Sequence, residues 1–389
     1  MHEYWLISAP GDKSPEETFN RIKSIKDRID GCNCHRFNFP LNDLRVGTLD
    51  SLVELSDVLQ RQDQYIEAVV RKLVSYLIEI LETQADSLED HLMVANRTAY
   101  RAYLEHFTWD FAKYPVQQSL KSLLDHIVKE VGQIESELKS KSQDYTALQN
   151  SIQSYVRQQT GSLITRDLDG IIKREHVEHV LNSEYFTIAA VVVPNSAVDE
   201  WKKTYESLLP EKVVPRSSQM IFSDHENTLF TVTLFAAQFA PFREKCREKK
   251  FMVRNYTYNE EVLSQNKQKQ KELEHKRDKQ YRNLLPWLKI QFGEAFSAWI
   301  HMKALRLFVE SVLRYGLPVN FVSALMHPRP KTQKKLRDML NKEFDKSEGG
   351  ALSEDIEMSR QFGFQAEEFY SYVSYPIKLD FAVASSIVK

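Results

Sequence analysis

The most continuous apolar pattern in the chain lies between Trp287 and Tyr315. Apolar residues there fall on nearly every side of a helical wheel, which is typical of a helix buried among other elements. Gly316 and Pro318 then favour the end of the helix, because glycine adopts the left-handed cap and proline blocks another turn. The pattern predicts the central helix of a sizeable hydrophobic core.

A second set of apolar positions repeats in alternating steps of four and three residues, with one break near Lys141. This spacing keeps a narrow apolar stripe on one side of a long helix, and about forty residues would form a rod of roughly 60 Å. We interpret the stripe as the seam of a neck helix over 119–160; the alternative is a helix that crosses a large core. The seam consists of Leu120, Leu124, Ile127, Val131, Ile134, Leu138, Tyr145, Leu148, Ile152 and Tyr155.

Residues 258–285 show the opposite pattern, with many charges, few apolar positions and no proline before Pro286. Such a segment predicts a solvent-exposed helix that continues toward the buried one, with a kink or a restart at Pro286. Two long helical segments would then flank one insert, and together they would form a neck with a domain at each end.

The insert, residues 161–257, alternates short apolar runs with two amphipathic segments. The order of predicted elements is β-α-β-β-α-β, the split βαβ or ferredoxin-like pattern. That fold hosts many functions and therefore indicates none by itself. The predicted elements are a strand over 185–193, a helix over 198–209, a hairpin of 213–222 with 228–235, a helix over 239–249 and a strand over 251–256.

The two ends of the chain also carry recognisable patterns. Leu49 to Leu59 and Ile66 to Leu81 have helical spacing, whereas Tyr4 to Ser8 and Tyr370 to Phe381 alternate like strands. We expect these terminal strands to pair, which would bring both chain ends into one domain. The predicted fold class is α+β and predominantly helical: an elongated, two-ended molecule with a foot (1–118 and 286–389), a neck (119–160 and 258–285) and a small α/β head (161–257).

Composition narrows the class of protein. The chain has 389 residues, 42% of them hydrophobic, and 52 basic against 54 acidic side chains give a net charge of −2. A balanced charge disfavours a nucleic-acid partner, which requires a concentrated basic face. No apolar run approaches the ~20 residues of a membrane span, and the first residues do not resemble a signal peptide. Three cysteines favour a reducing compartment, so we expect a cytoplasmic protein without direct membrane insertion.

The sequence contains no motif for a cofactor, a metal or a reaction. Cys32, Cys34 and His35 could contact one metal, but zinc needs about four ligands and no second pair follows, so a surface turn is favoured. His176 and His179 lack the spacing of H-E-x-x-H, which favours an exposed helix instead. We find no phosphate-binding loop and no nucleophile elbow. We therefore expect no catalytic residue, no metal and no cofactor.

One basic segment follows the buried helix and is the candidate docking site for a partner. Its residues are Arg329, Lys331, Lys334, Lys335 and Arg337. Two interpretations stay open: a solvated helix face, or a docking surface for an acidic partner, whose encounter such charge would accelerate.

The individual residues of the predicted buried helix, beyond their apolar pattern, resemble those of a known family. AWIHMKALRLFVESVLRYGLPVNF, residues 298–321, closely resembles the signature of the C subunit of the vacuolar-type proton-translocating ATPase (V-ATPase). Further matches follow the same order from residue 3 to about residue 340, whereas residues 345–364 fit no family pattern. These matches are EYWLISAPGDK (3–13), VGTLDSL (46–52), AKYPVQQSLKSL (112–123), GSLITRDL (161–168), SEYFTIAAVVVP (183–194), VVPRSS (213–218), VTLF (232–235) and NYTYNEE (255–261).

This resemblance implies a non-catalytic stator subunit of the pump's peripheral stalk. It implies contacts with subunits E and G, with the cytosolic domain of the membrane a subunit and with actin, and a role in the assembly and regulated association of the two sectors. It also implies a monomer within a hetero-oligomeric complex. That complex would lie at the cytosolic face of vacuolar, endosomal, lysosomal or plasma membranes and acidify compartments.

A rival from another class is a free-standing coiled-coil scaffold or actin-binding adaptor that uses the seam as a homodimer interface. Its size in solution would separate the two hypotheses, since the pump subunit is expected to be a monomer. An enzyme is the third hypothesis, and the lack of catalytic motifs disfavours it.

Overall fold

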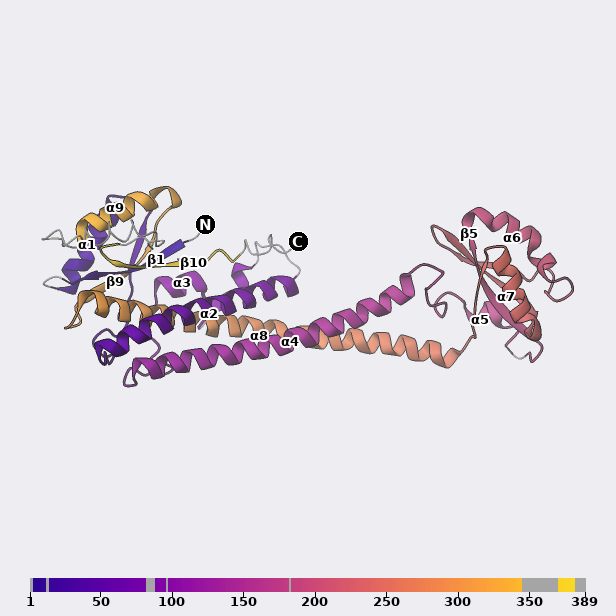
Figure 1. Cartoon of the computed structure of the whole chain (residues 1–389), viewed down its shortest axis with the longest axis horizontal. Helices are drawn as coiled ribbons and strands as arrows, with labels where there is room; N and C mark the ends of the chain where they lie inside the picture. The colour runs from indigo at the N-terminus through magenta and orange to yellow at the C-terminus, as the bar shows by residue number, and fades with distance from the viewer. Residues whose placement is uncertain are drawn as a thin grey trace. The chain divides into compact units, whose positions relative to one another are not determined.

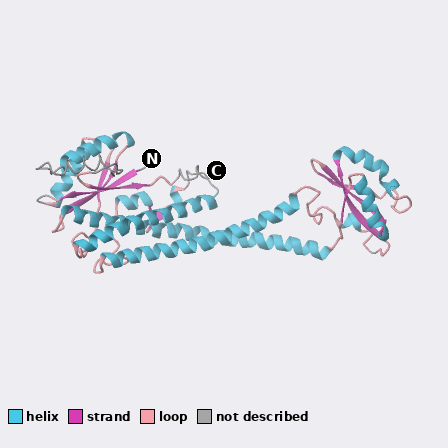
Figure 2. Cartoon of the chain, in the orientation of Figure 1, coloured by secondary structure: helices cyan, strands magenta, loops and turns pink. Residues whose placement is uncertain are grey.

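The computed structural model describes residues 3–11, 14–81, 88–95, 97–181, 183–344 and 370–381. The chain divides into two compact units, Met1–Lys141 with Asn283–Lys389, and Ser142–Arg282. It passes between the units within helices, since both α4 (Leu120–Thr160) and α8 (Glu260–Tyr315) contain a boundary (Figure 1). Figure 2 shows mostly helix with small sheets, as predicted; the finer division into foot, neck and head stays a prediction.

The first unit contains a four-stranded sheet with the order β10-β1-β9-β2. Its neighbouring strands are all antiparallel, and β1 pairs with β10 from Glu3↔Lys378 to Ser8↔Val373, which confirms the predicted pairing of the terminal strands. The sheet thereby joins segments from both ends of the sequence. The strands are β1 (Glu3–Pro10), β2 (Asn33–Arg36), β9 (Phe321–His327) and β10 (Val373–Lys378).

Helices lie on both faces of this sheet (Figure 1). On one face, α1 (Pro15–Asp27) and α9 (Gln333–Phe344) pack their apolar residues against alternate β1 side chains such as Trp5 and Ile7. On the other face, Tyr315 of α8 donates a hydrogen bond to the carbonyl of Ser8 (2.7 Å). The predicted buried helix is thus the second half of α8, where buried residues run from Leu284 to Val312.

α2 (Leu49–Leu81) is a single helix of 33 residues, whereas the sequence pattern predicts two segments. The residues between them include neither glycine nor proline, so nothing interrupts the backbone hydrogen bonds. Pro286 does not end α8 either. Pro286 and Arg282, whose carbonyl loses its donor, are both exposed, so water can satisfy that carbonyl.

The remaining elements of the first unit are short. The strands β3 (Met93–Val94) and β4 (Thr98–Ala99) form a two-stranded ladder, a 3-10 turn η2 (Glu89–His91) precedes them, and α3 (Tyr100–Glu105) follows. Gly293 of α8 faces this ladder: a Cβ there would lie 2.8 Å from the Met93 carbonyl oxygen, so only glycine permits this approach.

The second unit has the strand order β6-β7-β5-β8 with antiparallel neighbours throughout. This order and pairing confirm the predicted β-α-β-β-α-β pattern. The elements are β5 (Phe186–Pro194), α6 (Val198–Thr204), β6 (Gln219–Ser223), β7 (Asn227–Phe235), α7 (Phe239–Glu248) and β8 (Met252–Arg254), with 3-10 turns η3 (Asn195–Ala197), η4 (Tyr205–Leu208) and η5 (Ala236–Gln238).

Two apolar layers cover the sheet of the second unit. Trp201 of α6 and Phe242 of α7 belong to the cluster on one face, and Leu163, Leu168 and Val177 belong to the cluster with Ile188 and Leu229 on the other. Val177 is the last residue of the short helix α5 (Arg174–Val177). Strand β6 begins six residues later than predicted, because Pro215 cannot donate to a ladder and Arg216 adopts a positive φ of 56°.

Candidate functional site

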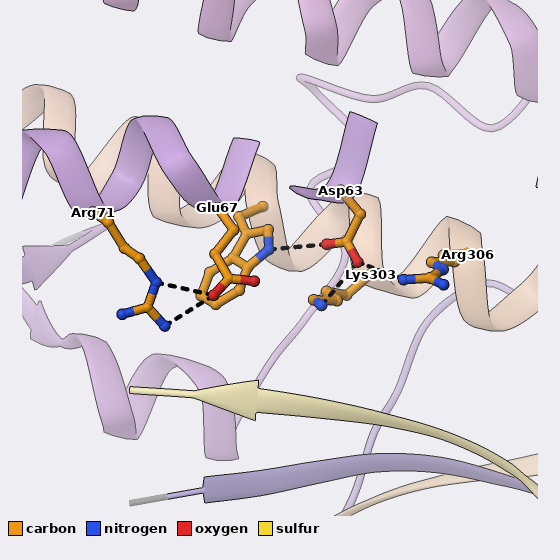
Figure 3. A network of polar contacts seen from close by, with 6 residues as sticks. Asp63, Glu67, Arg71, Lys303 and Arg306 are labelled. Carbon is orange, nitrogen blue, oxygen red and sulfur yellow. Dashed lines mark hydrogen bonds and ion pairs between the residues drawn. The ribbon is translucent and has the colours of Figure 1, made fainter. Parts of the chain in front are cut away.

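A charged network is buried between α2 and α8 in the first unit (Figure 3). The Asp63 carboxylate accepts three hydrogen bonds: from Trp299 Nε1 (3.0 Å), Lys303 Nζ (2.9 Å) and Arg306 Nη1 (2.8 Å). Asp63 is 2% exposed and Lys303 4%, so neither charge is hydrated by bulk solvent. A buried carboxylate without a cation or hydrogen-bond donor beside it would destabilise the folded chain. Here three donors satisfy the Asp63 carboxylate.

The neighbouring contacts extend this network to the C-terminal strand. The Arg306 guanidinium lies 4.2 Å from the centroid of the Tyr375 ring on β10. Arg71 of α2 donates to Glu67 Oε1 (2.8 Å) and to the Lys378 carbonyl (3.0 Å). The network therefore fixes α2, α8 and β10 against one another. Asp63 is buried, so its carboxylate is not open to a ligand from solvent.

The sequence patterns did not identify this network. A usable signal exists: Asp63 lies among the buried positions of α2, and Lys303 and Arg306 interrupt the most apolar stretch of α8. Charges in such positions are expected to be paired when they are buried. The sequence alone does not specify which acid pairs with which base.

His301 is buried in the same half of α8. Its Nε2 accepts a hydrogen bond from the Asp110 backbone N–H (3.0 Å), so its Nδ1–H donates to the Ser297 carbonyl (2.8 Å). Burial lowers the pKa of His301 from 6.5 to about 4, which keeps the ring neutral near pH 7. His301 thus anchors the loop between α3 and α4 to α8. The aromatic rings around it are Phe107, Trp109 and Tyr114.

The predicted seam lies on α4, and its burial changes along the helix. Leu120, Leu124, Ile127, Val131, Ile134 and Leu138 are at most 6% exposed, whereas Leu148 and Ile152 are half-buried. In the first unit, Tyr65 and Lys72 of α2 both donate to the Glu135 carboxylate, which places α2 beside α4. At the break in the pattern, Lys141 Nζ lies 5.3 Å from the centroid of the Trp287 ring.

The basic segment is separated by the structure into two sets. Arg329, Lys331, Lys334 and Lys335 are exposed. Arg337 is different, because its guanidinium lies between two rings, 4.1 Å from the Trp5 centroid and 4.3 Å from that of Tyr370. Such stacking is a packing interaction of the guanidinium, so Arg337 does not belong with the candidate docking residues.

The cysteines and histidines considered above as metal ligands do not form a common site. Burial raises the pKa of the Cys32 thiol to about 11 and that of the Cys34 thiol to about 12, which keeps both thiols protonated near pH 7. Cys34 and His35 are successive residues of β2 and point to opposite faces. His176 Nδ1 accepts from the Lys173 N–H (3.1 Å), whereas His179 Nε2 is hydrogen-bonded to Thr233 Oγ1 (2.9 Å).

Within the described residues, no group of three or more His, Cys, Asp or Glu side chains is arranged to hold a metal ion. Nor does the described part of the chain contain a helix with the length and apolar character needed to cross a membrane. Residues 345–364, which fit no family pattern, lie outside the described residues.

Comparison with known proteins gives one consistent result. The sequence matches the family described as the V-ATPase C subunit over residues 4–373. It is 45% identical over 386 residues to the C subunit of the V-type proton ATPase of Manduca sexta, covering 98% of each chain. It is 43% identical over 381 residues to the C 1-A subunit of the V-type proton ATPase of Danio rerio, covering 97% of this chain and 98% of that protein.

A solved structure, the cytoplasmic N-terminal domain of the I subunit, a homologue of the a subunit of V-ATPase, aligns over 86% of this chain and 95% of that one. Its identity is 12% and its TM-score 0.31, and a score this low supports no conclusion. The sequence comparisons cover nearly the whole chain at high identity. The chain belongs to the family of V-ATPase C subunits.

Proposed function

We propose that this protein is a non-catalytic stator subunit in the peripheral stalk of a V-ATPase, the pump that acidifies intracellular compartments. The observation that carries the proposal is the family match over residues 4–373, together with relatives that align over nearly their whole length. Those relatives are each named as the C subunit of a V-type proton ATPase, and we infer that this chain is a member of the same kind of complex.

The internal chemistry of the chain supports a structural role. The buried acid Asp63 is occupied by Trp299, Lys303 and Arg306, and the buried His301 is held neutral by its surroundings. In the described residues these groups hold elements together and are not exposed to a substrate. A protein that acts by binding partners needs this kind of interior and an exterior with specific surfaces.

The proposed partners are subunits E and G of the stalks and the cytosolic domain of the membrane a subunit, with actin as a further partner. The chain would bridge the stalks to the membrane sector and support assembly and regulated association of the two sectors. It would act as one copy in a hetero-oligomer at the cytosolic face of the membrane. The division into a foot, a helical neck and an α/β head belongs to this proposal.

The helical connections support a role under load. α4 and α8 continue across both unit boundaries without an intervening loop. Helical segments act as semi-rigid spacers, whereas flexible loops extend under force. A stator must resist the torque of a rotary motor, and a helical connection is suited to this task.

The rival scaffold hypothesis needs an exposed seam. From Leu120 to Leu138 the seam residues are at most 6% exposed in the isolated chain, so they are not available to a second copy. Equilibrium sedimentation of the purified chain tests this point directly: a monomer supports the pump subunit, and a tight dimer supports the scaffold.

The function itself is tested in cells that lack their own C subunit of the pump. Expression of this chain should restore association of the ATP-hydrolysing sector with membranes and ATP-driven proton transport. Separate assays of proton transport and ATP hydrolysis are needed, because a missing stator uncouples them. An expressed chain that does not associate with the membranes and does not restore transport would contradict the proposal.

A further inference from the structure

We propose that the exposed cations at the start of α9 form a docking surface for an acidic face of another protein. This inference deepens the proposed function, since it assigns the chemistry of one partner contact. We call the set the α9 basic surface; it consists of Arg329, Lys331, Lys334 and Lys335.

The four cations belong to one short stretch of fixed backbone. A 3-10 turn, η6 (Pro330–Thr332), leads directly into α9, and Thr332 Oγ1 donates to the Arg329 carbonyl (3.0 Å). The Arg329 side chain lies on Gly31, where a Cβ would be only 2.3 Å from Arg329 Nε. The surface therefore has a defined position on the first unit rather than being a loose tail.

None of these four cations forms an ion pair within the described part of the chain. Among the residues that the structure describes, two exposed acids lie close to these cations in the sequence or beside Gly31: Asp338 on α9 and Asp30. By contrast, Arg21 of α1 pairs with Glu343 of α9 at 2.8 Å on the same side of the sheet. Among the described residues, α1 and α9 thus neutralise Arg21, whereas the α9 basic surface keeps a net positive charge.

The positive charge at the start of α9 is also unfavourable for the stability of that helix. No acidic residue occurs in η6 or in the first turn of α9, where Lys334 and Lys335 face the positive end of the helix dipole. The neighbouring α1 has the favourable arrangement, with Ser14 as N-cap and Glu16 and Glu17 in its first turn. A feature that is unfavourable for local stability is expected where binding requires it.

The backbone beneath the surface is anchored. Leu336, Leu340 and Phe344 of α9 are at most 3% exposed, and Arg337 is held between the rings of Trp5 and Tyr370. The cations are therefore presented from a packed helix, so that little backbone ordering is needed on binding.

The surface chemistry favours a protein over a membrane. Among the described residues, no large exposed apolar side chain lies in η6 or α9. Peripheral membrane segments usually combine about 4–8 cations with apolar residues that enter the lipid. The Arg329 guanidinium can bind a carboxylate of such a protein through two parallel hydrogen bonds.

The test compares full-length variants, using poly-L-glutamate as the acidic polypeptide. Lys334→Glu with Lys335→Glu reverses the surface, and Lys267→Glu with Lys269→Glu reverses two exposed lysines away from a helix start as a matched control. We expect the first variant to lose about tenfold in affinity at moderate salt, with the difference shrinking at high salt, and the control to bind like the unmodified chain. Equal affinity of the unmodified chain and the first variant would overturn the proposal.

Two further measurements separate docking from a role of the lysines in folding or in lipid binding. The unfolding temperature of the variant with Lys334→Glu and Lys335→Glu, measured without a partner, should stay the same or rise by about 2 °C. The reversal replaces two cations at the positive end of the helix dipole by anions, which that end favours. A clear fall would show that the lysines are needed within the chain and would overturn the proposal. Tight binding of the unmodified chain to phosphatidylserine vesicles, lost in the first variant, would overturn it in favour of a membrane.

The same variants, rebound to pump membranes stripped of their C subunit, separate this inference from the proposed function. If the unmodified chain does not rebind, the proposed function fails, while the poly-L-glutamate comparison still decides the surface. If the unmodified chain and the reversed variant rebind equally across salt concentrations, the docking surface is wrong and the proposed function stands.

Discussion

The two halves of α8 have the same secondary structure and opposite surroundings. From Glu260 to Asn283, all of it described, no residue is buried, whereas the helix from Leu284 to Val312 contains every buried position of α8. Helix formation thus continues through both halves, and tertiary packing decides what each half does. A structural role can therefore be assigned to the buried half of α8, whereas the role of the exposed half stays open.

The charges of the two halves differ in the same way. In the exposed half, Arg277 pairs with its neighbour Asp278 at 2.9 Å in solvent, where an ion pair contributes little. In the buried half, Lys303 and Arg306 both meet Asp63 in the interior. Substitutions should therefore have large effects in one half and small effects in the other.

The largest effect is expected at the seam that packs in the first unit. Ile127 is fully buried, so Ile127→Lys should destabilise the chain by about 5 kcal/mol, because it places an unpaired charge in the core. Ile152 is half-buried in the second unit, and Ile152→Lys should cost much less. Urea unfolding followed by circular dichroism measures both; equal losses would mean that the burial difference along α4 is wrong.

The next largest effect concerns the buried network. Asp63→Ala leaves Lys303 and Arg306 without their acid and should destabilise the first unit by about 3–5 kcal/mol. The matched change in the exposed half, Asp278→Ala, should cost less than about 0.5 kcal/mol. A loss below about 1 kcal/mol for Asp63→Ala would indicate that water already solvates the network.

A smaller effect should appear as a dependence on pH. The pKa of His301 is about 4 in the folded chain against 6.5 in the unfolded chain, so the unfolded state binds the proton first as the pH falls. The stability from neutral His301 is complete above pH 6.5 and is lost as the pH falls toward 4. Between pH 7 and pH 5 the loss should be about 2 kcal/mol.

The control for this pH effect lies in the other half of the same helix. His301→Gln should remove that part of the pH dependence, whereas His275→Gln, at an exposed position, should leave it unchanged. Unfolding in urea at a series of pH values gives the comparison. Identical pH profiles for the unmodified chain and His301→Gln would contradict a buried neutral histidine.

A small gain in stability is expected near the point where the two halves of α8 meet. Pro286→Ala restores a backbone donor at an exposed helical position and should stabilise the chain by about 1 kcal/mol. Thermal unfolding would register the gain. A destabilisation would indicate that the proline ring itself makes a required contact.

Much of the fold could be predicted from local patterns. The β-α-β-β-α-β order follows from alternating apolar runs, and the pairing of β1 with β10 follows from two strand-like termini. Boundaries were less predictable: α2 continues through Gln60 to Tyr65 because its backbone meets no breaker, although the apolar spacing weakens there. Periodicity reports burial, and a helix can continue where burial is interrupted.

The site was less predictable than the fold. Arg337 looks like its neighbours in the sequence, but its position on α9 directs its guanidinium between Trp5 and Tyr370. Asp63, Lys303 and Arg306 meet only because α2 lies against α8, and no local pattern records contacts between residues some 240 positions apart. Pairings of this kind depend on tertiary structure, which a single sequence does not display.

We propose that the interior of this chain holds it together while its exterior binds partners. Hydrogen exchange of the free chain and of the chain assembled into the pump distinguishes these two roles. We predict slow exchange from Leu284 to Val312 in both states, faster exchange from Glu260 to Asn283 in the free chain, and new protection on assembly confined to exposed segments such as the start of α9. Rapid exchange from Leu284 to Val312 in the free chain, slowed only by assembly, would contradict this claim.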